Sequence, residues 1–125
     1  MAGSKGAKYF DIFLKYKIDL YSKETNRHIN DDFFKLLKEI NDTGSITKAA
    51  KKAGHSYRKV WGDIKRAEDF LGFSLVKKTR GGLKGGHTVL TSDGIELYQA
   101  FEVLHEEFDS AINKLTKSFF NKLNK

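Results

Sequence analysis

The sequence predicts a mainly α-helical fold with a small β component, and three observations lead to that prediction. Two short helical segments, at about residues 46–53 and 57–71, flank a glycine-containing turn. Two strand-like runs follow, around a loop rich in Gly and Lys. A last helical pattern then extends from residue 92 to about residue 123. These features predict a winged helix-turn-helix with an N-terminal strand, a two-stranded wing and a long C-terminal helix.

The first element is predicted from alternation. Six apolar side chains stand at every second position: Phe10, Ile12, Leu14, Tyr16, Ile18 and Leu20. A period of two indicates a strand with one buried face. The polar residues from 21 to 29 then predict a loop.

A helix is expected to begin after Asn30. The Asn30 side chain can cap it, and the carboxylates of Asp31 and Asp32 suit the positive end of a helix. Gly44 is expected to end it. Five apolar residues form its predicted buried face: Phe33, Phe34, Leu36, Leu37 and Ile40.

The next two helices form the helix-turn-helix. Ser45 is the expected cap of the first, in which the small residues Ala49, Ala50 and Ala53 let the two helices approach closely. Gly54 stands where the chain must turn and where a positive φ is expected.

Ser56 is expected to cap the third helix, and Gly72 to end it. Four positions share one stripe of this helix and predict its buried face: Val60, Ile64, Ala67 and Leu71. Trp61 lies beside this stripe and is predicted to be a core residue rather than a contact residue.

A wing is predicted over residues 73–91, with strands at 73–79 and 88–91. The connecting loop, residues 80–87, is too rich in glycine for regular structure. It lacks the strand-to-helix context and the Gly-Lys-Ser/Thr ending of a nucleotide-binding P-loop, so we reject that function for it.

The last helix is expected to start at Ser92 as its cap, supported by Asp93 and Glu96. About 30 residues of helix span roughly 45 Å. Six side chains follow a coiled-coil-like spacing, which Phe119 and Phe120 extend: Leu97, Phe101, Leu104, Phe108, Ala111 and Leu115. This seam predicts a homodimer interface. The alternative is that the first half packs on its own domain and the end frays.

The positive charge is concentrated in the middle of the chain. The net charge is +7, and residues 47–87 alone hold eleven Lys and Arg against three Asp and Glu. A basic segment that coincides with a helix-turn-helix pattern indicates binding to the phosphates of nucleic acid rather than a merely solvated surface.

Ten residues are predicted to contact DNA: Thr47, Lys48, Ser56, Tyr57, Arg58, Lys59, Lys65, Arg66, Arg80 and Lys84. The N-terminal part of a recognition helix meets base edges, so Arg58 can either bind guanine or grip a phosphate. Tyr57 can contact a thymine methyl group or a phosphate. Five further helix residues suit backbone contacts: Lys59, Lys65, Arg66, Thr47 and Lys48. Arg80 and Lys84 suit a minor groove or backbone contact from the wing.

Several classes of function are not expected. The chain has no Cys, its four histidines share no helical face, and no catalytic set stands out, so we expect no metal, no cofactor and no enzyme. No apolar run approaches a membrane span, and residues 1–8 lack a signal peptide's apolar segment, which predicts a cytoplasmic protein. The expected organisation is a disordered arm (1–8), a winged helix-turn-helix domain (9–91) and a dimerisation helix (92–123).

Over roughly residues 10–110 the chain resembles the DNA-binding domain of ModE-type, molybdate-responsive transcriptional regulators. These segments carry the resemblance: Gly44-Ser45-Ile46 with Ala49-Ala50, Ser56-Tyr57-Arg58 with Trp61, Thr79-Arg80-Gly81-Gly82 with Gly85-Gly86, and Val89-Leu90-Thr91 with Gly94. The first half also resembles the LysR-type winged helix, which shares the Gly-Ser-x-x-x-Ala-Ala pattern. The tryptophan and the glycine-rich wing favour the ModE type.

The resemblance implies a homodimer that binds operators of genes for molybdate uptake or molybdoenzymes. In full-length members, C-terminal domains sense molybdate; this chain reaches only Lys125, and we expect it to lack them. The sensor is then a separate protein, or another effector acts, or the regulator is constitutive.

Two further functions stay open at this point. The same basic face suits a nonspecific architectural or RNA-binding protein. A winged helix that serves as a protein-interaction module, docking a partner through its Phe-rich C-terminal helix, is the other.

Overall fold

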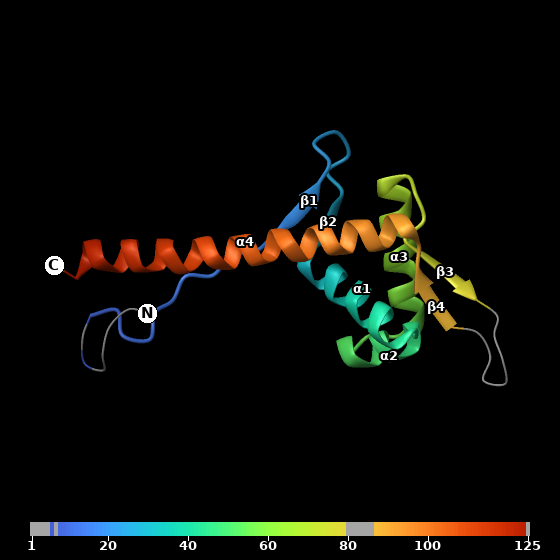
Figure 1. The fold of residues 1–125 in the computed structure, drawn as a ribbon, viewed down its shortest axis with the longest axis horizontal. Coiled ribbons are helices and arrows are strands. Elements are labelled where there is room, and N and C mark those ends of the chain that lie inside the picture. The colour runs from blue at the N-terminus through green and yellow to red at the C-terminus, as the bar shows by residue number, and fades with distance from the viewer. Residues whose placement is uncertain (1–5, 7, 80–86, 125) are drawn as a thin grey trace. The chain divides into compact units, whose positions relative to one another are not determined.

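The computed structural model describes residues 6, 8–79 and 87–124 of the chain. The predicted arm over residues 1–8 lies almost wholly outside them, and the wing loop from Arg80 to Gly86 lies outside entirely. In chain order the elements are β1 (Asp19–Tyr21), β2 (His28–Asn30), α1 (Asp31–Thr43), α2 (Ile46–Ala53), α3 (Tyr57–Leu71), β3 (Val76–Thr79), β4 (His87–Leu90) and α4 (Ser92–Leu123) (Figure 1). The prediction of a mainly α-helical winged helix-turn-helix is confirmed. No helix among these residues is long and apolar enough to cross a membrane.

The chain forms two compact units. Ile18–Phe101 is called here the winged-helix unit, and Met1–Lys17 with Glu102–Lys125 the terminal unit. Helix α4 contributes its first ten residues to the former and the remainder to the latter.

The first three helices of the winged-helix unit begin where their capping residues predict. The side chains of Asn30, Ser45 and Ser56 each accept a hydrogen bond from the backbone N–H three residues later. Gly54 ends α2 with φ of 74°, a conformation that costs glycine little. The boundaries of α1, α2 and α3 therefore follow from local sequence signals.

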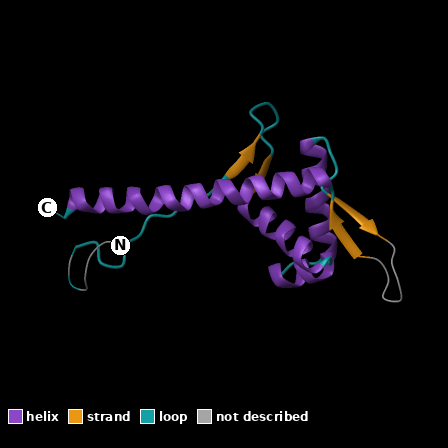
Figure 2. Cartoon of the chain, in the orientation of Figure 1, coloured by secondary structure: helices purple, strands orange, loops and turns teal. Residues whose placement is uncertain are grey.

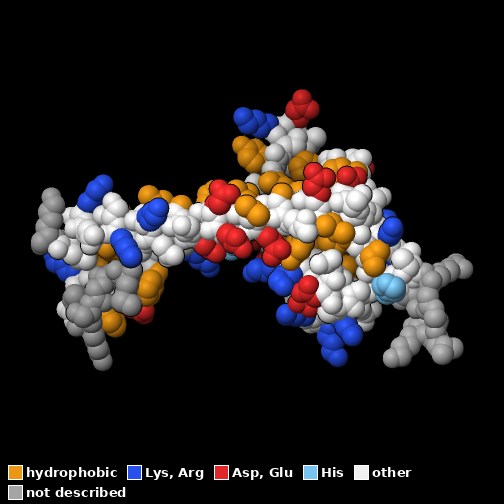
Figure 3. Space-filling model, in the orientation of Figure 1, with side chains coloured by type: hydrophobic (Ala, Val, Ile, Leu, Met, Phe, Trp, Pro, Cys, Tyr) orange, Lys and Arg blue, Asp and Glu red, His pale blue; other side chains and the backbone are white. Residues whose placement is uncertain are grey.

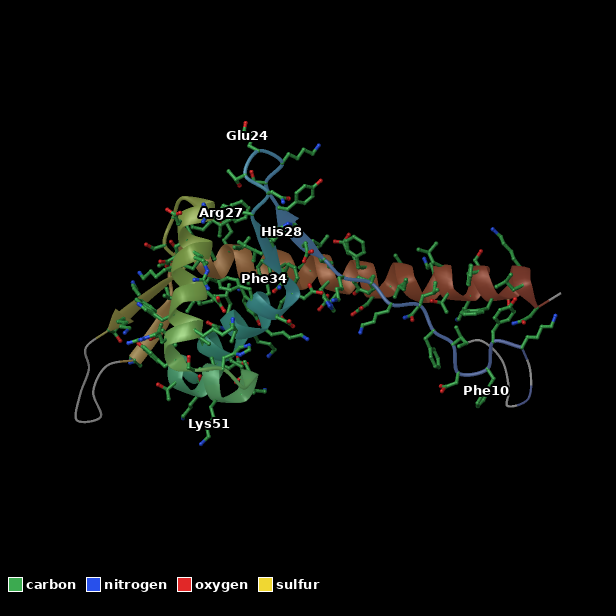
Figure 4. All side chains as sticks on the ribbon, turned by 180° about the vertical axis from the view of Figure 1, so that it is seen from behind. Phe10, Glu24, Arg27, His28, Phe34 and Lys51 are labelled. Carbon is green, nitrogen blue, oxygen red and sulfur yellow. The ribbon has the colours of Figure 1, made fainter. Side chains whose placement is uncertain are left out.

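The core of this unit is built from the predicted apolar faces. Leu37 and Ile40 of α1, together with Val60 and Ile64 of α3, are completely buried. The ring of Phe34, labelled in Figure 4, stacks on that of Phe101 of α4, and their centroids are 3.7 Å apart. Phe101 is thus buried within its own subunit.

The predicted strand over residues 10–20 is wrong for most of its length. Only Asp19–Tyr21 is a strand, and it pairs antiparallel with His28–Asn30, of which His28 and Ile29 lie in the segment predicted as a loop. The preceding residues lie in turns and irregular backbone (Figure 2), and Tyr9 and Asp11 both have φ of 62°. An extended strand cannot contain left-handed residues, and alternation alone does not supply the partner strand that a sheet requires.

The short β1–β2 ribbon is fastened to the end of α3 by Arg27. Its guanidinium lies 3.2 Å from the carboxylate of Asp69 and donates to the carbonyl oxygen of Arg66 at 3.0 Å (Figure 4). The same group lies over the ring of Phe70. The ribbon therefore supports the face of α3 that is turned away from the wing.

The wing is shorter than predicted. Strands β3 and β4 pair antiparallel, with Val76 opposite Leu90 and Lys78 opposite Thr88. Residues 73–75 are not part of β3, and Thr91 is not part of β4.

The cap of α4 also differs from the prediction: the Thr91 hydroxyl, not Ser92, accepts from the N–H of Gly94 at 2.9 Å. Thr91 is better placed because its hydroxyl also donates to the carbonyl of Ser74 at 2.6 Å, which anchors the cap to the base of the wing.

The terminal unit pairs the N-terminal segment with the second part of α4 (Figure 1). The Tyr16 hydroxyl donates to the carboxylate of Asp109, and the Tyr16 ring stacks on Phe108 at 5.6 Å. Tyr9 packs against the buried Phe120. Several apolar side chains on these two segments nevertheless remain exposed: Phe10, Ile12, Phe13, Leu14, Val103, Phe108, Leu115, Phe119 and Leu123.

The first turn of α4 passes so close to the wing base that only glycine fits there. A Cβ on Gly94 would collide with the carbonyl oxygen of Leu75 and lie 3.1 Å from its carbonyl carbon. We predict that Gly94→Ala lowers the free energy of unfolding by about 1–3 kcal/mol, because backbone has to shift. Urea denaturation measures this.

Gly62→Ala is the matched control within helix α3. Its Cβ would meet only the flexible end of Arg66, at 3.3 Å. The change should raise stability by about 0.4–1 kcal/mol. Equal effects of the two substitutions would contradict the steric account of Gly94.

Candidate nucleic-acid interface

The N-terminal end of α3 presents the predicted contact residues to solvent. Tyr57, Arg58 and Lys59 are all exposed. The Ser56 hydroxyl oxygen accepts from the N–H of Lys59 at 3.1 Å, so its main task is to cap the helix. Arg58 forms no hydrogen bond or ion pair with any of the described residues, which leaves its guanidinium available to a ligand.

Lys59 and Arg66 lie on one face of α3 and share a single carboxylate. Asp63 receives the ammonium of Lys59 at 3.0 Å on one oxygen and the guanidinium of Arg66 on the other. One negative charge against two positive charges leaves this face cationic. Exposed ion pairs of this kind contribute little to stability, so both cations can exchange partners with phosphate.

A second cationic group surrounds Trp61 on the wing side of α3. The ammonium groups of Lys65 and Lys78 lie 4.4 and 4.6 Å from the centroid of the Trp61 ring. Lys78 also donates to the hydroxyl oxygen of Tyr57 at 2.6 Å. We call Tyr57, Trp61, Lys65 and Lys78 the Trp61 cluster.

The cluster corrects one prediction and adds one residue. Trp61 is half-buried rather than a core residue, since its position is rotated by about 100° from that of Val60 on the helix. Lys78 was missed by the sequence analysis. A signal existed: the period of two in a strand places Lys78 on the same face as the buried Val76, turned toward α3.

Glu68 fastens the wing to α3. One oxygen of its carboxylate accepts from the backbone N–H groups of Leu75 and Val76, at 2.7 and 3.3 Å. The other oxygen lies 3.3 Å from the ammonium of Lys65. The side chain therefore sets the position of β3 relative to the recognition helix, and with it the position of Lys78.

Helix α2 adds exposed cations to the same unit. Thr47 and Lys48 lie exposed in its first turn, and Lys51 projects away from it (Figure 4). In the space-filling view, Lys and Arg side chains lie over α1 and α2 and also near the C-terminal end of α4, whereas Asp and Glu gather along the middle of α4 (Figure 3). Arg80 and Lys84, predicted to act from the wing, fall outside the described residues. Within the part that is described, no group of three His, Asp or Glu residues can hold a metal ion.

The arrangement has a counterpart among known proteins. The sequence profile of the family described as "Bacterial regulatory helix-turn-helix protein, lysR family" matches residues 32–95, just over half of the chain. The chain belongs to this family. The matched region runs from α1 through the helix-turn-helix and the wing to the first turn of α4.

Two relatives of this lysR-family chain carry the names ModE and MopB. It is 37% identical over 81 residues to the DNA-binding transcriptional dual regulator ModE of Escherichia coli K12, covering 65% of the chain and 31% of the relative. It is 35% identical over 89 residues to the molybdenum-pterin-binding protein MopB of Rhodobacter capsulatus, covering 71% of the chain and 32% of the relative. The chain thus spans about a third of the length of the curated relatives it matches, and the resemblance to the DNA-binding part of ModE-type regulators is confirmed.

The hydrogen bonds that Glu68 accepts from Leu75 and Val76 lead to a prediction about the stability of the protein. Glu68→Ala leaves two backbone N–H groups without their acceptor and should lower the free energy of unfolding by about 1–3 kcal/mol. Glu24→Ala, in the exposed β1–β2 turn (Figure 4), is the control and should change it by less than about 0.5 kcal/mol. Urea denaturation compares the two variants, and equal stabilities would show that Glu68 does not hold the wing against α3.

Proposed function

We propose that the protein is a sequence-specific transcription regulator that binds operator DNA as a homodimer. The guanidinium of Arg58 at the start of α3 is exposed and has no partner among the described residues, and this observation carries the proposal. A helix-turn-helix inserts this end of its second helix into the major groove, where arginine binds the O6 and N7 atoms of guanine. Such a protein works where genomic DNA lies, in the cytoplasm of a bacterium.

The other predicted residues take positioning roles. Lys59, Arg66 and Lys65 contact the phosphates beside the recognition helix, and Thr47 and Lys48 contact them from the first turn of α2. Arg80 and Lys84 extend the contact from the wing toward a minor groove or the backbone. Phosphate contacts fix the register of the protein, while Arg58 supplies base preference.

The second half of α4 supports a homodimer. Phe108, Leu115 and Phe119 keep 45%, 58% and 47% of their surfaces exposed, and all three belong to the predicted seam or its extension. Exposed apolar side chains in such a row indicate an interface. Two subunits would bind two half-sites of one operator.

The regulated genes are proposed from the relatives. Because these are named for ModE and molybdenum transport, genes for molybdate uptake or molybdoenzymes are the first candidates. The effector is molybdate acting through a separate sensing protein, another ligand, or none.

The experiment is a fluorescence titration of promoter DNA from the protein's genomic neighbourhood, with random duplex as competitor. It is run at two salt concentrations, with and without molybdate. A specific regulator should prefer its site by about 10³-fold or more. Binding that random duplex abolishes indicates an architectural protein, no binding indicates a protein-interaction module, and a shift with molybdate indicates direct sensing.

Arg58→Ala tests the assigned base contact. The substitution should cost about 1–3 kcal/mol of binding free energy and relax preference at one operator position. Competition against operators altered base by base measures both. Lys35→Ala, an exposed residue of α1, is the control and should bind like the unmodified protein. Unchanged preference in the Arg58 variant would remove this residue from base recognition.

Leu115→Glu tests the dimer. Burial of a leucine side chain contributes about 1.5–3 kcal/mol, so the substitution should raise the dimer dissociation constant about tenfold or more. Sedimentation equilibrium measures it, and Lys114→Glu, the exposed neighbour, is the control. If Leu115→Glu and Lys114→Glu leave the same dimer dissociation constant, the predicted seam is not the dimer interface.

A further inference from the structure

The Trp61 cluster holds two ammonium groups over one aromatic ring beside the recognition helix. We propose that Lys78 is a further phosphate ligand of the DNA site, and that Trp61 positions it. This inference rests on the proposed DNA-binding function and extends it to a strand residue and an aromatic ring that the sequence analysis did not assign to DNA.

The register of the wing determines where Lys78 points. Lys78 pairs with Thr88, which is 5% exposed, and Val76 on the same face pairs with the buried Leu90. Successive strand residues point to opposite faces, so Lys77 leaves the wing on the other side. Lys78 therefore extends from the inner face of the wing along α3, whereas its exposed neighbour Lys77 does not.

The partners of Lys78 hold it in place without neutralising it. Its ammonium lies 4.6 Å from the centroid of Trp61 and 5.3 Å from that of Tyr57. Among the described residues it forms no ion pair with a carboxylate, whereas Lys65, over the same indole, is paired with Glu68. Aromatic faces attract a cation but carry no net charge, so Lys78 keeps its full charge for a ligand.

The hydrogen bond to Tyr57 shows which ligand fits. The Tyr57 oxygen accepts from Lys78, which leaves the hydroxyl hydrogen free to be donated to another group. An ammonium and a phenolic O–H side by side present two donors to one acceptor-rich anion. Since both stand next to the N-terminal end of α3, a phosphate of the bound duplex fits them, and Tyr57 contacts phosphate rather than a thymine methyl group.

Lys78→Met tests the charge while keeping an unbranched apolar stem against the rings. The affinity for one duplex is measured by fluorescence anisotropy over a series of salt concentrations. Loss of one phosphate contact should flatten the slope of log affinity against log salt by about one unit. Specific and random duplexes should lose affinity by the same factor, because phosphates carry no base identity.

Lys77→Met is the matched control on the opposite face of the same strand. Its salt slope should equal that of the unmodified protein. Equal slopes for all three proteins would overturn the inference and leave the proposed function standing. If the Lys77 variant flattens the salt slope as much as the Lys78 variant does, the assignment to Lys78 is overturned as well. If the unmodified protein binds no duplex, both proposals are overturned.

The role of Trp61 is tested by coupling. Trp61→Leu should weaken binding. The double variant Trp61→Leu, Lys78→Met should bind DNA no more weakly than Lys78→Met alone, because both substitutions remove the same contact between Lys78 and phosphate. Trp61→Phe keeps an aromatic face and should restore most of the affinity, and it provides the test if the leucine variant does not fold. Additive losses would show that Trp61 does not act through Lys78.

Discussion

The peptide groups around Leu75 connect the parts of the winged-helix unit on which its DNA-binding face depends. The N–H of Leu75 donates to Glu68 of α3, and its carbonyl accepts from the N–H of Thr91 at 2.9 Å, just before α4. Its side chain is completely buried, and Gly94 gives the close approach that the backbone needs. One short segment thus holds α3, the wing and α4 in register. Because these hydrogen bonds satisfy backbone groups in a partly buried place, a missing partner there costs more than a lost surface ion pair.

The geometry around Leu75 explains how charge is distributed over α3. Once the wing is held against the helix, Lys78 reaches Tyr57 and Trp61, and Lys65 is drawn toward Glu68. On the opposite side, Asp63 holds both Lys59 and Arg66. Cations therefore line both flanks of the recognition helix, and Arg58 is left without a protein partner among the described residues between them. The proposed roles, base recognition by Arg58 and phosphate binding by the two flanks, match the arrangement expected for a helix in the major groove.

The terminal unit differs from the winged-helix unit because many of its apolar side chains remain exposed. Aromatic contacts join its two segments, such as those of Tyr16 with Phe108 and of Tyr9 with Phe120. The N-terminal segment covers part of the second half of α4 but leaves Leu115 and Phe119 exposed. A long helix with uncovered apolar side chains gains free energy by association, which is the basis of the proposed homodimer.

The boundaries of α1, α2 and α3 were determined by the sequence itself, because caps and terminal glycines act within a few residues. Asn30, Ser45 and Ser56 cap their helices as expected, and the buried stripes of α1 and α3 follow the helical period. Contacts between distant residues were decided only by the tertiary structure. Residues 10–18 alternate like a strand, yet no described segment pairs with them as a strand. Thr91 replaces Ser92 as the cap because Ser74 lies within reach, and Lys78 meets Trp61 because the wing folds back onto α3. Local periodicity constrains one segment at a time, whereas pairing and side-chain contact depend on which segment packs against it.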